Sequence, residues 1–448
     1  MLHNKTVPKA KGDFLLGNLS QIIANPFKAL CSWHQSDGDL VSFRLATRHF
    51  YLFSHPKLIE QALIKQSDVF NKIYNPDKPT GLALVLGEGL VTSKGDIWQR
   101  QRRLMQPVFQ RSNIVTLLPQ IVIAGNNMLD RWQRLGEGAE INVSKEMMQL
   151  TLEVITQTMF STSVLDKVEQ ISPALDALLK YATKTIINPF TAPLFIPTSA
   201  NKKFKRSLDI IDDVIYDIIE QRRSSSSLHN DLLDMLLQAR DEKTGERMTN
   251  KQIRDEVITI FSAGHETTSN LLSWTLYLLA RHPDVLAKLR QELDSVLQGK
   301  TPSLEDIQEL HYTKAILNES MRFRPPVGLM LRKINRDTVV DGYPLKAGRL
   351  AIFSIYNIHH HPEFWEQPEQ FDPDRFLTPE NRRFSFMPFG TGERVCIGNH
   401  FALIESQLLL TMIVQRYDLE LLNTDEIEIE MAVSLRPKGG VPVRLKRR

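Results

Sequence analysis

The chain has 448 residues, of which 42% are hydrophobic and 24% charged, and its net charge is +3. This composition predicts a globular chain that can bury a large core, and the small net charge gives no support for a nucleic-acid partner. The two cysteines, Cys31 and Cys396, are too few for a disulfide framework and favour a reducing, cytoplasmic location. Residues 1–12 contain no apolar run that could form a signal peptide or a membrane span, so we expect no transmembrane anchor and at most a peripheral membrane contact.

The N-terminal half is predicted to be mainly helical after one small hairpin. Residues 1–19 form an irregular N-terminal segment, and residues 40–45 and 49–53 are strand-like around a short turn. Residues 72–93 form a long loop rich in glycine and proline, which is more often functional than filler. Residues 186–197 are apolar and interrupted by prolines, a pattern that fits packing over a pocket or contact with a membrane surface.

A helix predicted around residues 97–104 places Trp98 and Arg102 four residues apart, on one face. Taken alone, this pair is more typical of an interfacial tryptophan beside a solvated arginine than of a binding site.

A much longer helix is predicted between Thr249 and His282. Thr249 to Gln252 has the form of a capping box, and His282-Pro283 ends the pattern. Apolar residues occur on all sides of this helix, which predicts that it is buried. A rod that crosses the core favours one domain over residues 1–448, although length alone would suggest two or three.

The middle of this helix interrupts its own apolar pattern with Ala263-Gly264-His265-Glu266-Thr267. The Thr267 hydroxyl is placed to compete for the Ala263 carbonyl and to open the helical ladder. An acid beside an alcohol at such a distortion can hold water and pass protons inward. The alternative is that these polar residues face a solvated groove.

Three arginine positions follow the long helix. Arg322 lies three residues after Glu319, a spacing that by itself indicates a weak surface ion pair. Arg332 ends an extended apolar segment, and Arg375 lies in a turn, Pro373 to Phe376.

The segment from Pro388 to Gly398 contains the second cysteine. Gly390 and Gly392 allow a tight loop, and Cys396 precedes an apolar helical pattern. Orphan N–H groups and the dipole at a helix N-terminus favour a thiolate, so Cys396 beside Arg394 is a candidate metal ligand. A buried core cysteine is the alternative and, from this loop alone, equally probable.

Together, these motifs resemble the cytochrome P450 family of haem-thiolate monooxygenases from about residue 8 to the C-terminus. Residues 389–398 match the cysteine signature F-x-x-G-x-R-x-C-x-G at every fixed position. The family's oxygen-activation motif, E-x-x-R pair, P-E-R-F turn and W-x-x-x-R helix match segments of this chain. The matching segments are Ala263–Thr268, Glu319–Arg322, Pro373–Phe376 (with Asp374 in place of glutamate) and Trp98–Arg102.

The resemblance implies a mainly α fold with small β-sheets, in which the long central helix lies over haem b. It implies that Cys396 ligates the iron, that Phe389 shields the sulfur and that Gly398 lets the backbone donate to it. It also implies haem-propionate or haem-face positions, namely Trp98, Arg102, Ala263, Gly264, Arg332 and Arg394. Glu266 and Thr267 would guide water and protons during oxygen activation, and Glu319, Arg322 and Arg375 would form a buried structural triad.

The expected function is the insertion of one oxygen atom of O2 into a C–H or C=C bond of a hydrophobic substrate. Five apolar segments are expected to line the pocket, which favours a hydrophobic substrate. Arg48 or Tyr51 could meet a carboxylate at the mouth of the pocket. Among the candidate substrates we therefore rank a fatty acid slightly above a terpenoid, a steroid or a polyketide. Those segments are Leu82–Leu86, Ile186–Ile196, Ile260–Ala263, Val327–Leu331 and Val433–Leu435. We expect a monomer without a fused reductase that receives electrons from a separate ferredoxin or flavodoxin, with Arg100, Arg103 and Arg111 as possible docking residues.

Two other functions remain to be weighed. A haem-thiolate sensor would change shape without turnover, and it would not need the acid–alcohol pair. A zinc or redox cysteine protein lacks the necessary ligand spacing around Cys396 and Cys31.

Overall fold

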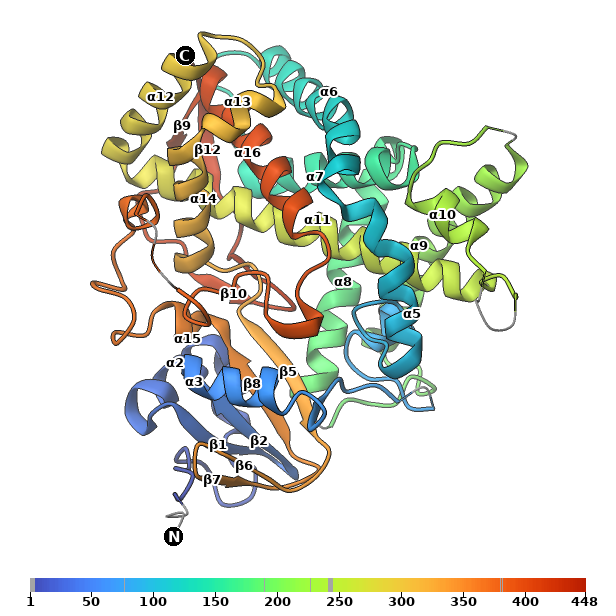
Figure 1. Cartoon of the computed structure of the whole chain (residues 1–448), viewed down its shortest axis with the longest axis vertical. Helices are drawn as coiled ribbons and strands as arrows, with labels where there is room; N and C mark the ends of the chain where they lie inside the picture. Colours follow the sequence, from blue (N-terminus) through green and yellow to red (C-terminus); the bar gives the residue numbers. More distant parts are fainter. Residues whose placement is uncertain are drawn as a thin grey trace.

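The structure is a computed structural model that describes residues 5–75, 77–188, 190–225, 227–240, 245–378, 380 and 382–448 (Figure 1). Residues 1–4 of the predicted N-terminal segment and residue 189 of the predicted apolar segment 186–197 lie outside this part. Over the described residues the chain is mainly helical with small β-sheets, which confirms the predicted fold class. No helix in these ranges combines the length and hydropathy that crossing a bilayer requires.

The long helix α11, Asn250–Arg281, crosses the molecule as predicted (Figure 1). Thr249 caps it with a full capping box, since the Thr249 hydroxyl accepts from the Gln252 N–H and the Gln252 side chain accepts from the Thr249 N–H. His282 ends it, and α12 (Pro283–Leu297) begins at the following proline.

Helices surround α11 on most sides, which explains why it is apolar all round. The helices that contact it directly include α7 (Val143–Phe160), α9 (Ser199–Ser224), α14 (His311–Phe323) and α16 (Asn399–Arg416). The remaining helices longer than a single turn are α1 (Leu19–Ala24), α2 (Pro26–Asp37), α5 (Gly95–Met105), α6 (Arg111–Leu135), α8 (Val168–Ile187), α10 (Leu232–Gln238) and α13 (Leu304–Glu309). The short helices α3 (Pro56–Ile59), α4 (Ala83–Leu86) and α15 (Ile355–His359) lie in connecting segments.

The largest sheet among the described residues has the strand order β1-β2-β8-β5-β3 and lies on the N-terminal side of the molecule. Its strands are β1 (Leu40–Leu45), β2 (Arg48–Phe53), β8 (Leu350–Ser354), β5 (Leu329–Ile334) and β3 (Phe70–Asn71). The predicted hairpin is confirmed, and Ala46 takes a positive φ of 52° in its turn. β2 and β8 pair in parallel, whereas the other neighbours are antiparallel.

Three smaller sheets complete the described strands. They are β4 (Glu140–Asn142) with β12 (Pro442–Arg447) and β9 (Tyr417–Leu421), β10 (Ile429–Met431) with β11 (Leu435–Pro437), and β6 (Thr338–Val340) with β7 (Tyr343–Leu345). The β10–β11 hairpin matters most for the site, because β11 contacts α11.

The predicted triad of Glu319, Arg322 and Arg375 is buried and closed, so a weak surface pair is the wrong description of it. Arg322 Nε donates to Glu319 Oε2 at 2.7 Å, and Arg375 Nε donates to Glu319 Oε1 at 3.2 Å. Glu319 and Arg322 have no exposed surface. Arg322 Nη2 also donates to Glu319 Oε1 at 2.8 Å, and the other three Arg322 N–H groups donate to the carbonyl oxygens of His359, Pro368 and Gln370.

We expect Arg322→Ala to lower the free energy of unfolding by about 3–5 kcal/mol, because it leaves the buried Glu319 charge without its main partner. Arg336→Ala is the control, since Arg336 and Asp68 form an ion pair with about two thirds of each side chain exposed, and it should leave the urea midpoint unchanged. Equal midpoints for the two variants in urea unfolding followed by circular dichroism would contradict the structural role of the triad.

Candidate active site

The loop before α16 holds Cys396 in a tight backbone conformation. Gly390 and Gly392 have φ angles of 74° and 71°, which residues with a Cβ rarely adopt. The Cys396 N–H donates to the Phe389 carbonyl at 2.9 Å and closes the loop. The side chain of Cys396 is exposed, so its sulfur is accessible.

The Cys396 thiol is not biased toward the anion, contrary to the prediction from its place before a helix. Burial raises the pKa of the Cys396 thiol, and the lowering effects of the Gly398 N–H and of the Arg102 charge are smaller. A sulfur that is accessible yet strongly desolvated opens onto internal space rather than onto bulk solvent. A metal ion at the sulfur would reverse this balance, because ligation requires the thiolate.

An accessible stripe runs along the middle of α11. Ala263, Gly264 and Thr267 retain accessible surface, whereas the rest of the segment between Ile253 and Leu279 is buried. Ala263 and Thr267 are four residues apart and so share one face. The Thr267 hydroxyl donates to the Ala263 carbonyl at 2.6 Å, as predicted.

Gly264 has a packing reason to be glycine. A Cβ at this position would lie 2.5 Å from Ile155 Cδ1 of α7, so a larger residue would require the Ile155 side chain to move. The missing side chain therefore allows α11 and α7 to approach each other.

Helix α16, which follows the cysteine loop, packs against α11 (Figure 1). Thr268, next to Thr267, donates a side-chain hydrogen bond to Glu405 in α16. The cysteine loop and the accessible face of α11 are thus connected through α16 and are candidates for one site.

Basic residues cluster at the edge of this site. Arg394 lies over the Trp98 ring, 3.9 Å from its centre, and Arg102 donates to the Val395 carbonyl at 2.9 Å. Arg332 is buried, and desolvation lowers its pKa and that of Arg394 to about 10. The structure thus brings together all four predicted residues of this edge.

Lys72 belongs to the same cluster and was missed by the sequence analysis. Desolvation, then the charges of Arg332 and Arg394, hold the pKa of Lys72 well below its usual range, although part of its surface is accessible. Lys72 follows β3 in the irregular segment 72–93, where no motif marks it. Among the described residues, no carboxylate lies within ion-pair distance of Lys72, Arg332 or Arg394, so the cluster suits a ligand that carries its own carboxylates.

Comparisons with known proteins identify the ligand chemistry. The family model described as Cytochrome P450 matches residues 8–442. The chain belongs to the cytochrome P450 family. Haem is therefore the cofactor of this chain. The chain is a haem monooxygenase that acts on hydrophobic substrates, and it is not a haem-thiolate sensor without turnover.

Curated relatives cover most of this cytochrome P450. It is 32% identical to a cyclooctat-9-en-7-ol 5-monooxygenase of Streptomyces melanosporofaciens, over 90% of this chain and 87% of that protein. It is 33% identical to a pentalenene oxygenase of Streptomyces avermitilis, over 90% of this chain and 89% of that protein. It is 31% identical to a putative cytochrome P450 132 of Mycobacterium tuberculosis, over 92% and 90%.

The donor set of the site fits haem. The site residues include an accessible sulfur at Cys396, an accessible and mainly apolar stripe on α11, and desolvated cations that have no carboxylate within ion-pair distance among the described residues. A soft thiolate suits iron, and guanidinium and ammonium groups suit carboxylates.

Glu266 takes a different direction from its neighbour Thr267. It is 6% exposed, and its Oε1 accepts from the Ser434 hydroxyl at 2.6 Å. Burial raises the pKa of the Glu266 carboxyl, while the Ser434 hydrogen bond lowers it by less. The acid and the alcohol of the predicted pair thus occupy different surroundings.

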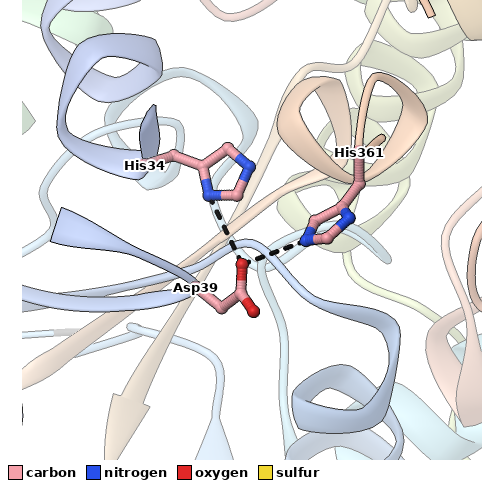
Figure 2. Close-up of side chains that lie close together, drawn as sticks. All are labelled: His34, Asp39 and His361. Atoms are coloured by element: carbon pink, nitrogen blue, oxygen red, sulfur yellow. Dashed lines mark hydrogen bonds and ion pairs between the residues drawn. The ribbon is translucent and has the colours of Figure 1, made fainter. Parts of the chain in front are cut away.

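A second cluster of titratable residues lies far from Cys396 in the fold, at the N-terminal sheet (Figure 2). His34 Nδ1 and His361 Nε2 lie 3.6 and 3.0 Å from Asp39 Oδ1. The Glu363 N–H donates to His361 Nδ1, which places the ring proton on Nε2. His361 Nε2 therefore donates to Asp39 and has no lone pair with which to bind a cation. The three side chains instead hold α2 against the segment after α15.

We expect Lys72→Met and Arg332→Met each to speed haem loss by about tenfold, because each removes a charged hydrogen-bond donor from the haem carboxylates. Lys333→Met is the matched control, since Lys333 is exposed and adjacent to Arg332 on β5. Haem transfer to excess apomyoglobin measures the rates. Three equal rates would show that the cluster does not face the haem carboxylates.

Proposed function

We propose that Cys396 would ligate the haem iron and that Gly398 N–H and Phe389 would support its sulfur. The observation that carries this proposal is the accessible yet desolvated sulfur of Cys396, in the loop before a helix that packs against α11. Arg102 adds a positive charge that favours the thiolate. Lys72, Arg332 and Arg394 then bind the haem propionates, with Trp98 fixing Arg394 by a cation–π contact.

The reaction consumes a substrate R–H, dioxygen, two electrons and two protons, and it yields R–OH and water. Bound haem supplies the activation of dioxygen and the oxidation of the substrate C–H bond. The protein must orient the substrate, exclude bulk water and deliver the protons. We propose that Ala263 leaves space above the haem, that Thr267 orders water there, and that Glu266 passes protons to that water.

We infer that the substrate is a neutral terpenoid rather than a fatty acid. Half-buried apolar side chains remain in the segments predicted to line the pocket, among them Leu82, Leu84, Val327 and Leu331. The pentalenene oxygenase among the relatives supports a terpene.

The two residues expected to meet a carboxylate are engaged elsewhere. Tyr51 is 2% exposed and its hydroxyl accepts from Arg349 at 2.7 Å. Arg48 donates to the carbonyls of Thr185 and Ile186 at 3.2 and 3.0 Å and so ties the hairpin to the end of α8. The observed contacts of Arg48 and Tyr51 therefore do not support the predicted carboxylate anchor, because both side chains serve packing between elements.

We propose that the electrons arrive from a separate ferredoxin or flavodoxin on the side of Cys396. Arg103 on α5 and Arg111 at the start of α6 are exposed. Arg102 of the same helix reaches the Val395 carbonyl, which places this basic surface beside the cysteine loop. An acidic electron donor would be attracted to it.

We expect Thr267→Ala to lower the fraction of electrons that end in product by about tenfold, with a matching rise in hydrogen peroxide, because proton delivery loses its ordering hydroxyl. Substrate affinity should not change. Thr275→Ala is the matched control, since its hydroxyl also bonds the carbonyl four residues earlier, at 2.8 Å, but is fully buried. Product formed per NADPH or NADH consumed is the measurement, and full coupling in Thr267→Ala would refute the relay.

We expect a neutral sesquiterpene or diterpene to bind at least about tenfold more tightly than a fatty acid of similar size, because a buried carboxylate without a cation is costly. Titrations followed by the haem spectrum give both affinities. Arg48→Ala should leave them unchanged. Tighter binding of the fatty acid, lost in Arg48→Ala, would restore the carboxylate anchor and overturn the terpenoid proposal.

A further inference from the structure

The Glu266 carboxylate is held by a residue that the sequence analysis counted within an apolar segment. Ser434 lies in the 433–435 segment, immediately before β11, and is 3% exposed. Its hydroxyl donates to Glu266 Oε1 at 2.6 Å and accepts from Asn270 Nδ2 at 2.9 Å. Asn270 lies four residues after Glu266, on the same face of α11.

The amide nitrogen of Asn270 can only donate, so Asn270 occupies one lone pair of the Ser434 oxygen and leaves the Ser434 proton for Glu266. A donor aimed at a carboxylate favours its ionised form. Ser434 therefore opposes the desolvation that raises the pKa of Glu266.

The hairpin that carries Ser434 continues to a charged group at the surface. Two residues on, Arg436 donates to Asp176 Oδ1 of α8 at 2.6 Å and to Glu430 Oε2 of β10 at 2.8 Å. About a third of the Asp176 side chain and 39% of the Glu430 side chain are exposed. The Arg436 charge lowers the pKa of Glu266 and the Asp176 charge raises it, so this group lies within electrostatic range of the buried acid.

We propose that Ser434, oriented by Asn270, is the positioning residue of Glu266, holding its carboxylate toward the β10–β11 hairpin and poised to exchange protons. This inference rests on the proposed relay role of Glu266. No bond other than O–H is broken, and every proton that Glu266 passes toward Thr267 is replaced by one from water on the side of the hairpin. We assign Ser434 no contact with the substrate or the haem, so it acts through Glu266.

The test is an infrared titration of the Glu266 carboxyl band in the holoenzyme, with the band assigned by its loss in Glu266→Gln. Ser434→Ala should raise the titration midpoint by about one pH unit, because the ionised form loses its donor. Ser434→Thr keeps the hydroxyl and should restore the midpoint to within a few tenths of a unit. Ser406→Ala is the matched control, since Ser406 is fully buried on α16 and its hydroxyl has no hydrogen-bond partner among the described residues.

The second readout is the coupling, which is the product formed per NADPH or NADH consumed. The proton-donating form of Glu266 is lost as the pH rises through its pKa, so the alkaline decline in coupling should move to higher pH in Ser434→Ala and return in Ser434→Thr. An unchanged infrared midpoint in Ser434→Ala would overturn the positioning role while leaving the relay intact. Full coupling in Glu266→Gln would refute the relay itself, and with it the functional role of Ser434.

Discussion

The structure depends on a constraint imposed by α11, which is buried along most of its length and yet carries polar groups. A buried polar group without a partner is costly, and other segments of the chain meet several of these groups. Glu256 accepts from the Leu90 N–H at 3.1 Å, and Thr268 bonds Glu405 of α16. Trp274 donates to the Leu435 carbonyl at 3.1 Å. The partners come from the 72–93 loop, from α16 and from β11, so satisfying α11 also places the walls of the active site.

The cations at the haem edge, unlike the paired polar groups of α11, are desolvated without a carboxylate partner among the described residues. Lys72, Arg332 and Arg394 are desolvated and repel one another, which lowers the stability of the protein alone. A ligand with two carboxylates removes this cost, so haem binding and folding stability are coupled.

The sequence was informative where chemistry requires a fixed residue at a fixed spacing. The glycines before Cys396, the capping box of Thr249 and the Thr267–Ala263 bond were predictable because each depends on residues close in the chain. Lys72 and Ser434 were not, because their roles arise from contacts across the fold. The long-range partners of Arg48 and Tyr51 could not be predicted for the same reason.

Three buried glutamates lie on or against α11, and their surroundings separate their roles. Burial raises the pKa of Glu256 to about 8, and its carboxylate binds the backbone of the 72–93 loop. Burial raises the pKa of Glu405 well above its usual range, and only the Thr268 hydroxyl opposes it. Glu266 has both the Ser434 donor and the Arg436 charge to oppose desolvation. Glu266 is also next to Thr267 in the chain, so of the three its surroundings fit the proposed relay role best.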